Sequence, residues 1–489
     1  PPRLLRRPPR STPRPSRRQR QMCIRDRGYY EPLTFECDAP DLVIEGEIPS
    51  DLNGTFYRNG PNPQVPPKNE YHFFTGDGMI HAFHFDNGRV SHKNRWARTE
   101  RFKIERRVGE SMFSGLNPLD TDPKYLDFVL TDKEGVANTS VVHHGGRLLL
   151  LEEGHLPFEM DPDTLQSHGA WSFYGKLSTT MSAHPKVDPA NGDMIFHAYM
   201  ASGPFSDDLG LYRVTSDGHM VESHMFKAPY SAMVHDFVVT ENYILFPVMP
   251  ITGDLGRAME GKPPFAWEPD KPTQLGVMPR NGTPDDIVWL EGDACYVFHF
   301  MNGHDKDGVI TLEACHFDSP PLFPMADGTP TPPNIHPSLA RWTIDLNEPN
   351  PRVKMAYLAD HGAEFPVIDP RFAMREYQHG WYTSSDRTIP AHIPDSDVVY
   401  NSIVHFDVKS HKADSYAFKQ GYVAEPMFVP RSSSAGEGEG YVLCCVYDIP
   451  TNTSALCVFD AQNISAGPMG KAWLSHRVPV SFHGTWRPA

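Results

Sequence analysis

From residue 28 to the C-terminus, the sequence alternates short apolar runs with glycine-containing turns and shows little helical periodicity. Turns such as Asn87-Gly88 and Asp217-Gly218 are strong hairpin signals, because both residues of each pair tolerate positive φ. Strands are predicted over residues 41–48, 54–58, 72–75, 79–85, 147–152, 194–199, 237–239, 243–248, 296–300, 309–315, 339–346, 402–408, 415–420, 440–447 and 455–459. Antiparallel strands without a strand–helix–strand rhythm predict an all-β sandwich, barrel or propeller.

Length favours the propeller among these three. About 460 residues are too many for one sandwich but fit six to eight four-stranded blades of roughly 60–75 residues. No crisp repeat is visible, so the blades are expected to be degenerate in sequence. Three Pro-containing connections are too long for hairpin loops and are expected to cover a site or form a lid: 250–284, 319–337 and 360–375.

Charge separates the first 27 residues from the rest of the chain. They hold ten Arg and one Asp, whereas the remainder holds 35 Lys and Arg against 60 Asp and Glu, within a net charge of −16. The leader, residues 1–27, has six Pro and no apolar core of a signal peptide, so it is expected to be disordered or non-native. Residues 28–489 are expected to form one domain, whose acidic balance argues against nucleic acid as a partner.

Two further sequence features bear on the cellular compartment of the protein. No window of about 18 apolar residues exists, so no transmembrane helix is predicted. The seven Cys form no CxxC pair and no framework spacing, which suits a reducing compartment. A cytoplasmic, bacterial-type location is therefore expected, and the sequence leaves the oligomeric state open.

Four of the 24 His lie in similar settings, at the start or in the interior of an apolar strand: His184, His235, His299 and His483. Their spacings of 51, 64 and 184 residues exclude a zinc finger or a helical HExxH site, whose ligands lie close together. Such spacing suits a propeller, in which the inner strand of each blade lines a central axis. Four neutral imidazoles favour a first-row transition metal, and Fe, Cu, Ni and Zn all remain open at this point.

Three Glu in apolar or tight contexts could support such a centre: Glu153, Glu364 and Glu425. A metal-bound His commonly donates its other ring N–H to a carboxylate, which fixes its tautomer and orientation. A Glu inside an apolar stretch is unfavourable unless it is paired. Each Glu taken alone is better interpreted as a surface charge at the end of a strand, but the joint pattern of four His and three Glu favours the metal centre.

Long motifs carry a family resemblance from about residue 29 to the C-terminus. They are GTFYRNGPNP (54–63), YHFFTGDGMIHAFHFDNGRV (71–90), ANTSVVHHGGRLLLLEEGHLPFEMDPDTL (137–165), AHPKVDPANGD (183–193), MVHDFVVTENYILFP (233–247), AEFPVIDPRF (363–372), AEPMFVPR (424–431) and FHGTW (482–486). With these motifs the chain resembles the carotenoid cleavage oxygenases, non-haem iron enzymes that cleave C=C bonds with O2.

The resemblance implies a seven-bladed propeller with a dome of loops and helices over its top face. By motif position, it implies that one Fe(II) per chain is bound by the four His named above and that the three Glu are partners of three of them. Thr139 is implied to restrict an open coordination position, so that O2 has one favoured place to bind. The expected reaction joins a small apolar alkene and O2 to give two carbonyl products.

Two substrate classes remain open. The family's phenylpropenoid branch, which cleaves hydroxystilbenes, lignostilbenes and isoeugenol-like compounds, generally holds the substrate's phenol oxygen with a Tyr and a Lys. This sequence has Leu116 near the first position and Glu152 at the second. Leu offers no hydrogen bond and Glu would repel a phenolate, so these substrate-contact candidates favour a carotenoid or apocarotenoid. A phenylpropenoid is the alternative, and Glu152 could also simply point outward.

A polyene substrate would be drawn from membranes, so an apolar rim making weak peripheral membrane contact is expected from Ile251, Leu255, Met259, Phe265 and Trp267. The same side chains could instead be buried dome packing. Rival functions are a calcium-dependent propeller hydrolase, a metal-free binding propeller, and an isomerase or hydrolase using the same iron site. Four central His speak against the first of these, because Ca²⁺ takes oxygen ligands.

Overall fold

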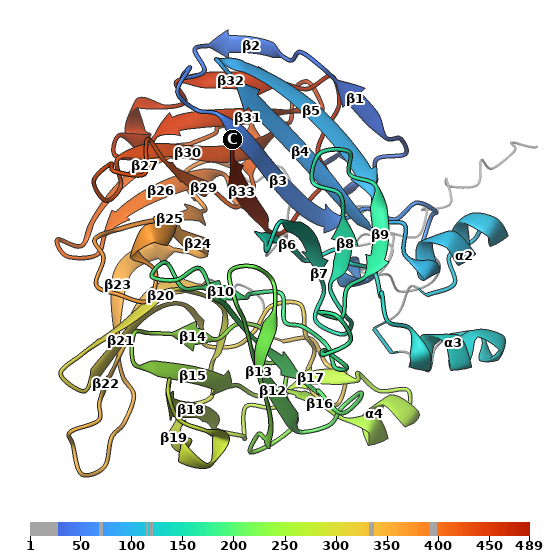
Figure 1. Ribbon diagram of the computed structural model, residues 1–489, viewed down its shortest axis with the longest axis vertical. Helices are drawn as coiled ribbons and strands as arrows, with labels where there is room; N and C mark the ends of the chain where they lie inside the picture. Colours follow the sequence, from blue (N-terminus) through green and yellow to red (C-terminus); the bar gives the residue numbers. More distant parts are fainter. Residues whose placement is uncertain are drawn as a thin grey trace, which may run out of the picture.

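The computed structural model describes residues 28–67, 72–113, 116–117, 119, 121–331, 337–390 and 399–489. Seven antiparallel sheets are arranged as blades around a common centre (Figure 1), so the all-β, seven-bladed propeller is confirmed. The predicted leader, residues 1–27, lies outside the described residues. Within the described part of the chain, no helix is long and apolar enough to cross a membrane.

Five blades have four strands each, and the first strand of each order lies nearest the centre of the ring in Figure 1. These blades are β6 (Ser140–His144), β7 (Arg147–Leu151), β8 (Phe158–Met160) and β9 (Ser167–Ala170); β10 (Lys186–Val187), β11 (Met194–Tyr199), β12 (Asp208–Val214) and β13 (Met220–Lys227); β14 (Val238–Val239), β15 (Tyr243–Val248), β18 (Thr273–Pro279) and β19 (Val288–Gly292); β20 (Tyr296–Lys306), β21 (Val309–Phe317), β22 (Ser338–Asp345) and β23 (Lys354–Gly362); and β24 (Glu364–Ile368), β25 (His379–Ser384), β26 (Ser402–Asp407) and β27 (Lys412–Ala417).

The two remaining blades close the ring by combining strands from both ends of the chain. One has the order β1 (Cys37–Ala39), β5 (Arg89–Trp96), β4 (Gly78–Asp86), β3 (Gly54–Pro61) and β33 (Gly484–Pro488). The other contains β2 (Val43–Gly46), β32 (Gly470–Trp473), β31 (Thr453–Asp460), β30 (Gly440–Asp448) and β28 (Gly421–Val423), with β29 (Met427–Pro430) paired to β30. Backbone hydrogen bonds between distant parts of the chain therefore hold the ring shut.

Helices and loops gather on one side of the ring, where Figure 1 shows α2 (Glu100–Val108), α3 (Leu126–Thr131) and α4 (Leu255–Met259). The 3-10 turns are η1 (Gly28–Tyr30), η2 (Phe73–Thr75), η4 (Pro123–Tyr125), η5 (Pro284–Asp286), η6 (Pro370–Phe372) and η7 (Ile464–Ala466). Phe113, Leu116, Val129 and Leu130 from this side line a cavity, as the expected dome of loops and helices would.

Most predicted strands overlap observed ones, and three expectations were wrong. The connection 360–375 is not a covering loop, since it holds the end of β23, all of the inner strand β24 and η6. Residues 72–75 form no strand, because Phe73–Thr75 is a 3-10 turn closed by hydrogen bonds from Thr75 to the carbonyl of His72. The connection 250–284 is not a plain loop, since it holds the hairpin of β16 (Ile251–Gly253) and β17 (Phe265–Trp267), followed by β18. Its dense Pro and Gly hid these strands.

The expected apolar rim is only partly exposed. Ile251 pairs with Trp267 in the β16–β17 hairpin, and both side chains are buried. Phe265 packs against Phe205 with ring centroids 5.6 Å apart. Leu255 and Met259, on α4, are exposed. The hairpin thus uses most of this apolar surface for packing, as the alternative interpretation held.

Candidate metal centre

The propeller brings the four candidate His to the inner strands of four different blades. His184 lies two residues before β10, His235 lies three residues before β14, His299 lies within β20, and His483 directly precedes β33. Because an inner strand borders the central axis, each blade delivers one imidazole to the same place. The wide sequence spacing is therefore a consequence of one ligand per blade.

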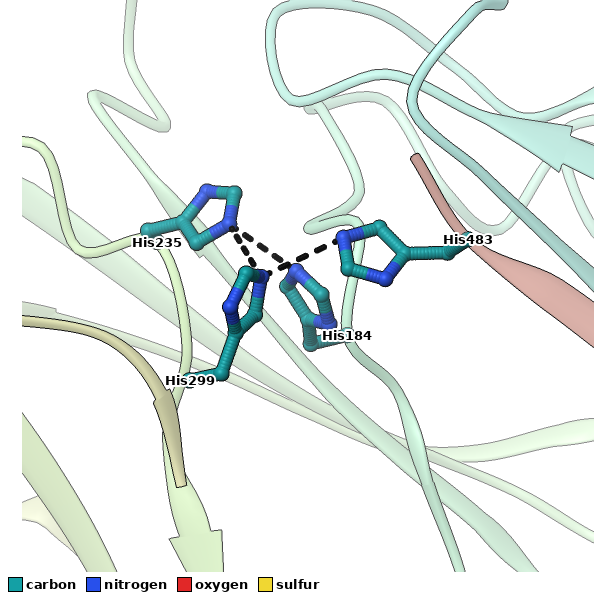
Figure 2. Close-up of side chains that lie close together, drawn as sticks. All are labelled: His184, His235, His299 and His483. Carbon is teal, nitrogen blue, oxygen red and sulfur yellow. Dashed lines mark hydrogen bonds between the residues drawn. The ribbon is translucent and has the colours of Figure 1, made fainter. Parts of the chain in front are cut away.

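The four imidazoles face one another through their Nε2 atoms (Figure 2). Nε2 of His184 lies 3.0 Å from that of His235, which lies 3.4 Å from that of His299. Nε2 of His299 lies 3.2 Å from that of His483. The four candidate ligand atoms all lie within 4.8 Å of one another. This separation is what four donors around one small cation require.

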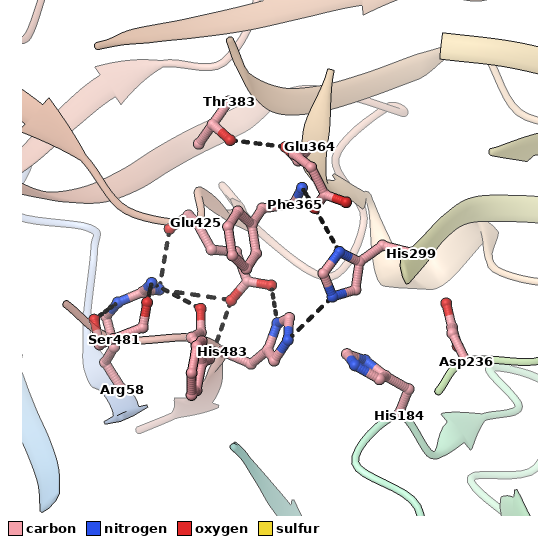
Figure 3. A network of polar contacts seen from close by, with 12 residues as sticks. Arg58, His184, Asp236, His299, Glu364, Phe365, Thr383, Glu425, Ser481 and His483 are labelled. Atoms are coloured by element: carbon pink, nitrogen blue, oxygen red, sulfur yellow. Dashed lines mark hydrogen bonds and ion pairs between the residues drawn. The ribbon is translucent and has the colours of Figure 1, made fainter. Parts of the chain in front are cut away.

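Three of the four rings present their other nitrogen to a carboxylate. His235 Nδ1 pairs with Glu153, His299 Nδ1 lies 2.5 Å from Glu364 Oε2, and His483 Nδ1 lies 2.7 Å from Glu425 Oε1. Figure 3 shows the last two of these pairs side by side. The three Glu predicted from sequence context therefore lie where partners of metal-bound imidazoles would lie.

This arrangement fits a cation between the rings. A neutral imidazole carries one N–H, and the carboxylate at Nδ1 takes it. Nε2 of His235, His299 and His483 then carries a lone pair, so three acceptors face one another at 3.2–3.4 Å. Lone pairs crowded in this way repel unless a positive charge lies between them. Imidazole donors suit divalent first-row transition metals.

Burial shapes the charge state of the centre. Burial and the neighbouring imidazoles lower the pKa of His184 and of His483 well below the ordinary value, which favours the neutral, ligating form. Burial is the largest single effect on His235 and would lower its pKa, but the paired Glu153 carboxylate, together with the charges of Asp236 and Glu364, raises it. Burial raises the pKa of Glu425 to about 7, against the opposing charge of Arg58.

Each carboxylate is itself fixed by a second contact. The Tyr199 hydroxyl donates to Glu153 Oε2 at 2.6 Å, and the Gly484 backbone N–H donates to Glu425 Oε2 at 2.8 Å. The Phe365 backbone N–H donates to Glu364 Oε2 at 2.6 Å, and Phe365 itself has a positive φ of 51°. Positive φ in a non-glycine residue is strained and is often retained at functional sites. Each of the three carboxylates therefore has a further hydrogen bond that fixes its orientation toward the imidazole.

Two buried charged residues of this region were missed by sequence reasoning. Asp236 accepts from Lys186 Nζ at 2.6 Å and from the backbone N–H of Phe300 at 2.9 Å. Lys186, Asp236 and Phe300 follow the candidate ligands His184, His235 and His299 by one or two residues, so Asp236 ties three ligand-bearing segments together. The available signal was a charged residue within two positions of His184 and of His235.

Arg58 is the second missed residue and has no exposed surface. Its Nη1 lies 3.6 Å from Glu425 Oε2, and its Nη2 donates to the carbonyl of Phe482 at 2.7 Å. Its Nε donates to Ser481 Oγ at 2.6 Å. Figure 3 shows that Arg58 reaches both Glu425 and the segment leading to His483. Arg58 thus positions one carboxylate and one imidazole.

A cavity of about 580 Å³ opens onto the centre. Its lining includes three of the four His, the predicted residues Thr139, Leu116 and Glu152, and the aromatic rings of Phe74, Phe298, Phe365 and Phe482. The Thr139 hydroxyl donates to Asn138 Oδ1 at 3.0 Å. A cavity that combines apolar and aromatic side chains with convergent polar groups is typical of a site for a small ligand.

Glu152 lines this cavity rather than pointing outward. Its Oε2 accepts from the Val136 backbone N–H at 2.8 Å, and its Oε1 lies 3.0 Å from His155 Nδ1. Burial alone would raise its pKa, but the charges of His155 and Arg101 and the hydrogen bonds to it bring the pKa down to about 2. Arg101 lines the same cavity and pairs with Asp132 at 2.6 Å. One wall of the cavity is therefore strongly charged.

Several known proteins are similar to this chain in sequence and in fold. Isoeugenol monooxygenase from Pseudomonas nitroreducens is 38% identical, with 94% of this chain and 97% of that protein covered. Apocarotenoid-15,15'-oxygenase from Synechocystis is 30% identical, with 97% and 99% covered. The crystal structure of Pseudomonas brassicacearum lignostilbene dioxygenase has a TM-score of 0.91 at 36% identity, covering 98% of this chain and 100% of that one. Cobalt-substituted Synechocystis apocarotenoid oxygenase has a TM-score of 0.83 at 28% identity, covering 96% and 99%.

The family model described as Retinal pigment epithelial membrane protein matches residues 30–488, nearly all of the described chain. The relatives named above are oxygenases, and one of their structures carries a metal ion in place of the native one. This agrees with a non-haem metal centre in the four-histidine site. The chain belongs to the Retinal pigment epithelial membrane protein family, that of the carotenoid cleavage oxygenases, as its sequence motifs predict.

Proposed function

We propose that this protein is an Fe(II)-dependent oxygenase that cleaves an alkene C=C bond with O2 to give two carbonyl products. One iron per chain would be held by Nε2 of His184, His235, His299 and His483. The observation that carries the proposal is the set of converging Nε2 atoms with three Nδ1 atoms on carboxylates. Four imidazoles accept several first-row metals. The similarity to oxygenases favours iron among them and O2 as the co-substrate.

The protein's own residues orient and enclose the reactants. Bound iron supplies the electrons that activate O2, as cofactors carry the chemistry that side chains cannot. Glu153, Glu364 and Glu425 hold three imidazoles in one tautomer and partly balance the charge of the metal. Phe298 and Phe365 provide apolar walls that exclude water and hold the alkene beside the centre. The Thr139 side chain narrows the approach to it.

A phenylpropenoid is the proposed substrate. Identity to isoeugenol monooxygenase, 38%, exceeds identity to the apocarotenoid oxygenase, 30%. The charged wall of Arg101, Glu152 and His155 offers a polar anchor. A neutral phenol can donate a hydrogen bond to the Glu152 carboxylate, whereas a hydrocarbon polyene cannot. An apocarotenoid is the second candidate, because Leu116 and Glu152 stand where the phenylpropenoid branch has a Tyr and a Lys, and Glu152 would repel an ionised phenol. A cytoplasmic location is proposed with it, since the related monooxygenase is bacterial.

The test is anaerobic reconstitution with Fe(II), followed by parallel O2 uptake and product mass on isoeugenol, a hydroxystilbene and an apocarotenal. Aromatic aldehyde formation with O2 consumption supports the proposal. Apocarotenal cleavage alone would move the protein to the second candidate. Isomerised or hydrolysed product without O2 uptake would contradict oxidative cleavage altogether.

A polar anchor predicts discrimination between isoeugenol and its O-methyl ether. Loss of a hydrogen bond to a charged group costs about 1.5–3 kcal/mol, so kcat/KM for the ether should fall ~10- to 100-fold. The ether differs from isoeugenol by one added methyl group on that oxygen, and the propenyl C=C bond that is cleaved is the same in both. Equal kcat/KM for both would show that the charged wall does not touch the phenol oxygen.

Replacing Glu364 by Ala should lower iron affinity about 10- to 100-fold, because His299 loses the carboxylate that orients it. Glu348→Ala is the matched control, since Glu348 pairs with Lys354 at the surface. Iron content after dialysis against a graded chelator measures the effect. Equal retention in both variants would remove Glu364 from the centre.

A further inference from the structure

A second cluster of metal-ligating side chains lies at the closure of the ring. Cys37 lies on β1, His92 on the neighbouring β5, and His476 in the connection between β32 and β33. Cys37 Sγ lies 3.9 Å from His92 Nδ1 and 3.9 Å from His476 Nε2. The three ligand atoms lie within 4.8 Å of one another, and none of the three residues lines the cavity of the four-histidine centre.

Hydrogen bonding alone accounts poorly for this cluster. A thiol has one proton, so Cys37 can donate to only one of the two rings that face its sulfur. In a tetrahedral zinc site, Zn–S of about 2.3 Å and Zn–N of about 2.0 Å place sulfur and nitrogen roughly 3.5 Å apart. The observed 3.9 Å separations therefore need to close by only a few tenths of an ångström around an ion.

The second nitrogen of His92 is already occupied. His92 Nε2 lies 3.2 Å from Nδ1 of His81, which is buried on β4. A hydrogen bond at Nε2 fixes the ring orientation and leaves Nδ1 directed at Cys37. Metal-bound imidazoles generally have such a partner on their other nitrogen. His92 thus has the contacts of a ligand on both sides of its ring.

The backbone holds the other two residues in place. The Cys37 N–H donates to Asn94 Oδ1 at 2.8 Å, and its carbonyl accepts from Arg95 Nη1 at 3.1 Å. The His476 carbonyl accepts from the Ser454 N–H at 3.0 Å. Cys37 and His476 are each partly exposed, so an ion has a route to the cluster. The site is therefore both preorganised and accessible.

We propose that Cys37 Sγ, His92 Nδ1 and His476 Nε2 bind one Zn²⁺, with water completing a tetrahedral site. Binding releases the thiol proton to solvent, because the thiolate is the ligand. Thiolate and imidazole together suit this borderline-soft ion. This site is separate from the proposed iron centre, and its role would be to cross-link two blades.

The proposed zinc site lies where the two ends of the chain meet. Cys37 lies near the N-terminus of the described chain, and His476 lies 439 residues later. Figure 1 shows the blue N-terminal strands and the red C-terminal strands meeting at the top of the view. Zn²⁺ would cross-link the two blades that share strands from both chain ends, in addition to the pairing of β2 with β32 and of β3 with β33. Binding that favours only the folded ring raises its stability by mass action.

The test uses the full chain loaded with Fe(II), titrated anaerobically with Co²⁺ and, separately, with Zn²⁺. Co²⁺ reports thiolate ligation through a sulfur-to-cobalt charge-transfer band, which the four-histidine centre cannot produce. We expect one equivalent of Co²⁺ with this band and a rise in thermal unfolding temperature with one equivalent of Zn²⁺. Cys37→Ser and His476→Asn should each abolish the band and the temperature rise.

The matched control is Cys23→Ser, which removes a thiol from the sequence outside the described residues. It should keep both the band and the temperature rise. His184→Ala, which alters the proposed iron centre, should also keep them, so failure of the iron proposal is distinguishable from failure of this one. No thiolate band in the parent protein, or a band that survives Cys37→Ser, would overturn the zinc site.

Discussion

Replacing His235 by Ala should strip iron from the purified protein and reduce C=C cleavage to background. His235 Nε2 lies between those of His184 and His299, at 3.0 and 3.4 Å, so its loss removes a central ligand. It also leaves Glu153 with the Tyr199 hydroxyl but without the imidazole that it orients. The loss of affinity should exceed the ~10- to 100-fold expected for removal of a partner carboxylate.

Iron content, O2 uptake and product yield measure this result together. His168→Ala is the matched control, because the His168 side chain is 45% exposed on β9, faces Glu159 at the surface and lies away from the metal centre. Circular dichroism and thermal unfolding establish that the His235 variant is folded. Added imidazole should restore part of the iron by filling the space left by the ring. Full iron and full turnover in the variant would exclude His235 as a ligand.

The four His could be selected from sequence because each lies in or beside an apolar strand, where a buried polar ring is unfavourable unless it has a partner. Glu364 and Glu425 were detectable for the same reason, since their neighbours are Phe-Pro and Pro-Met. The pairings themselves were not readable from the sequence: His299 meets Glu364 across 65 residues, and Arg58 meets Glu425 across 367. Only the closed ring creates these contacts.

Local sequence carried some information that went unused. Glu152 and His155 are three residues apart, close enough to pair without any tertiary structure. The prediction that Glu152 would repel a phenolate treats it as a lone charge, although its partner lies three residues away. The fold errors have a local cause as well, since Thr75 competes for the carbonyl of His72 and converts an aromatic run into a 3-10 turn.

Replacing Arg58 by Met should lower the free energy of unfolding by about 3–5 kcal/mol, the usual result of removing one partner from a buried ion pair. Met keeps most of the length of the side chain, so the change removes charge and donors rather than volume. Glu425 would lose its cation, and the carbonyls of Ser481 and Phe482 would lose a donor inside the protein. The segment that carries His483 would loosen in consequence.

Arg487→Met is the matched control, because Arg487 on β33 pairs with Asp163, whose side chain is 74% exposed. A surface pair of this kind contributes about 0–1 kcal/mol. Urea unfolding of the metal-free proteins separates the two effects from any stabilisation by bound iron. Arg58→Lys should fall between parent and Met, since Lys keeps the charge but loses the planar fork that reaches several acceptors. If Arg58→Met costs no more than Arg487→Met, the buried network does not hold Glu425 and His483 together, and their alignment must come from the pairing of β3 with β33.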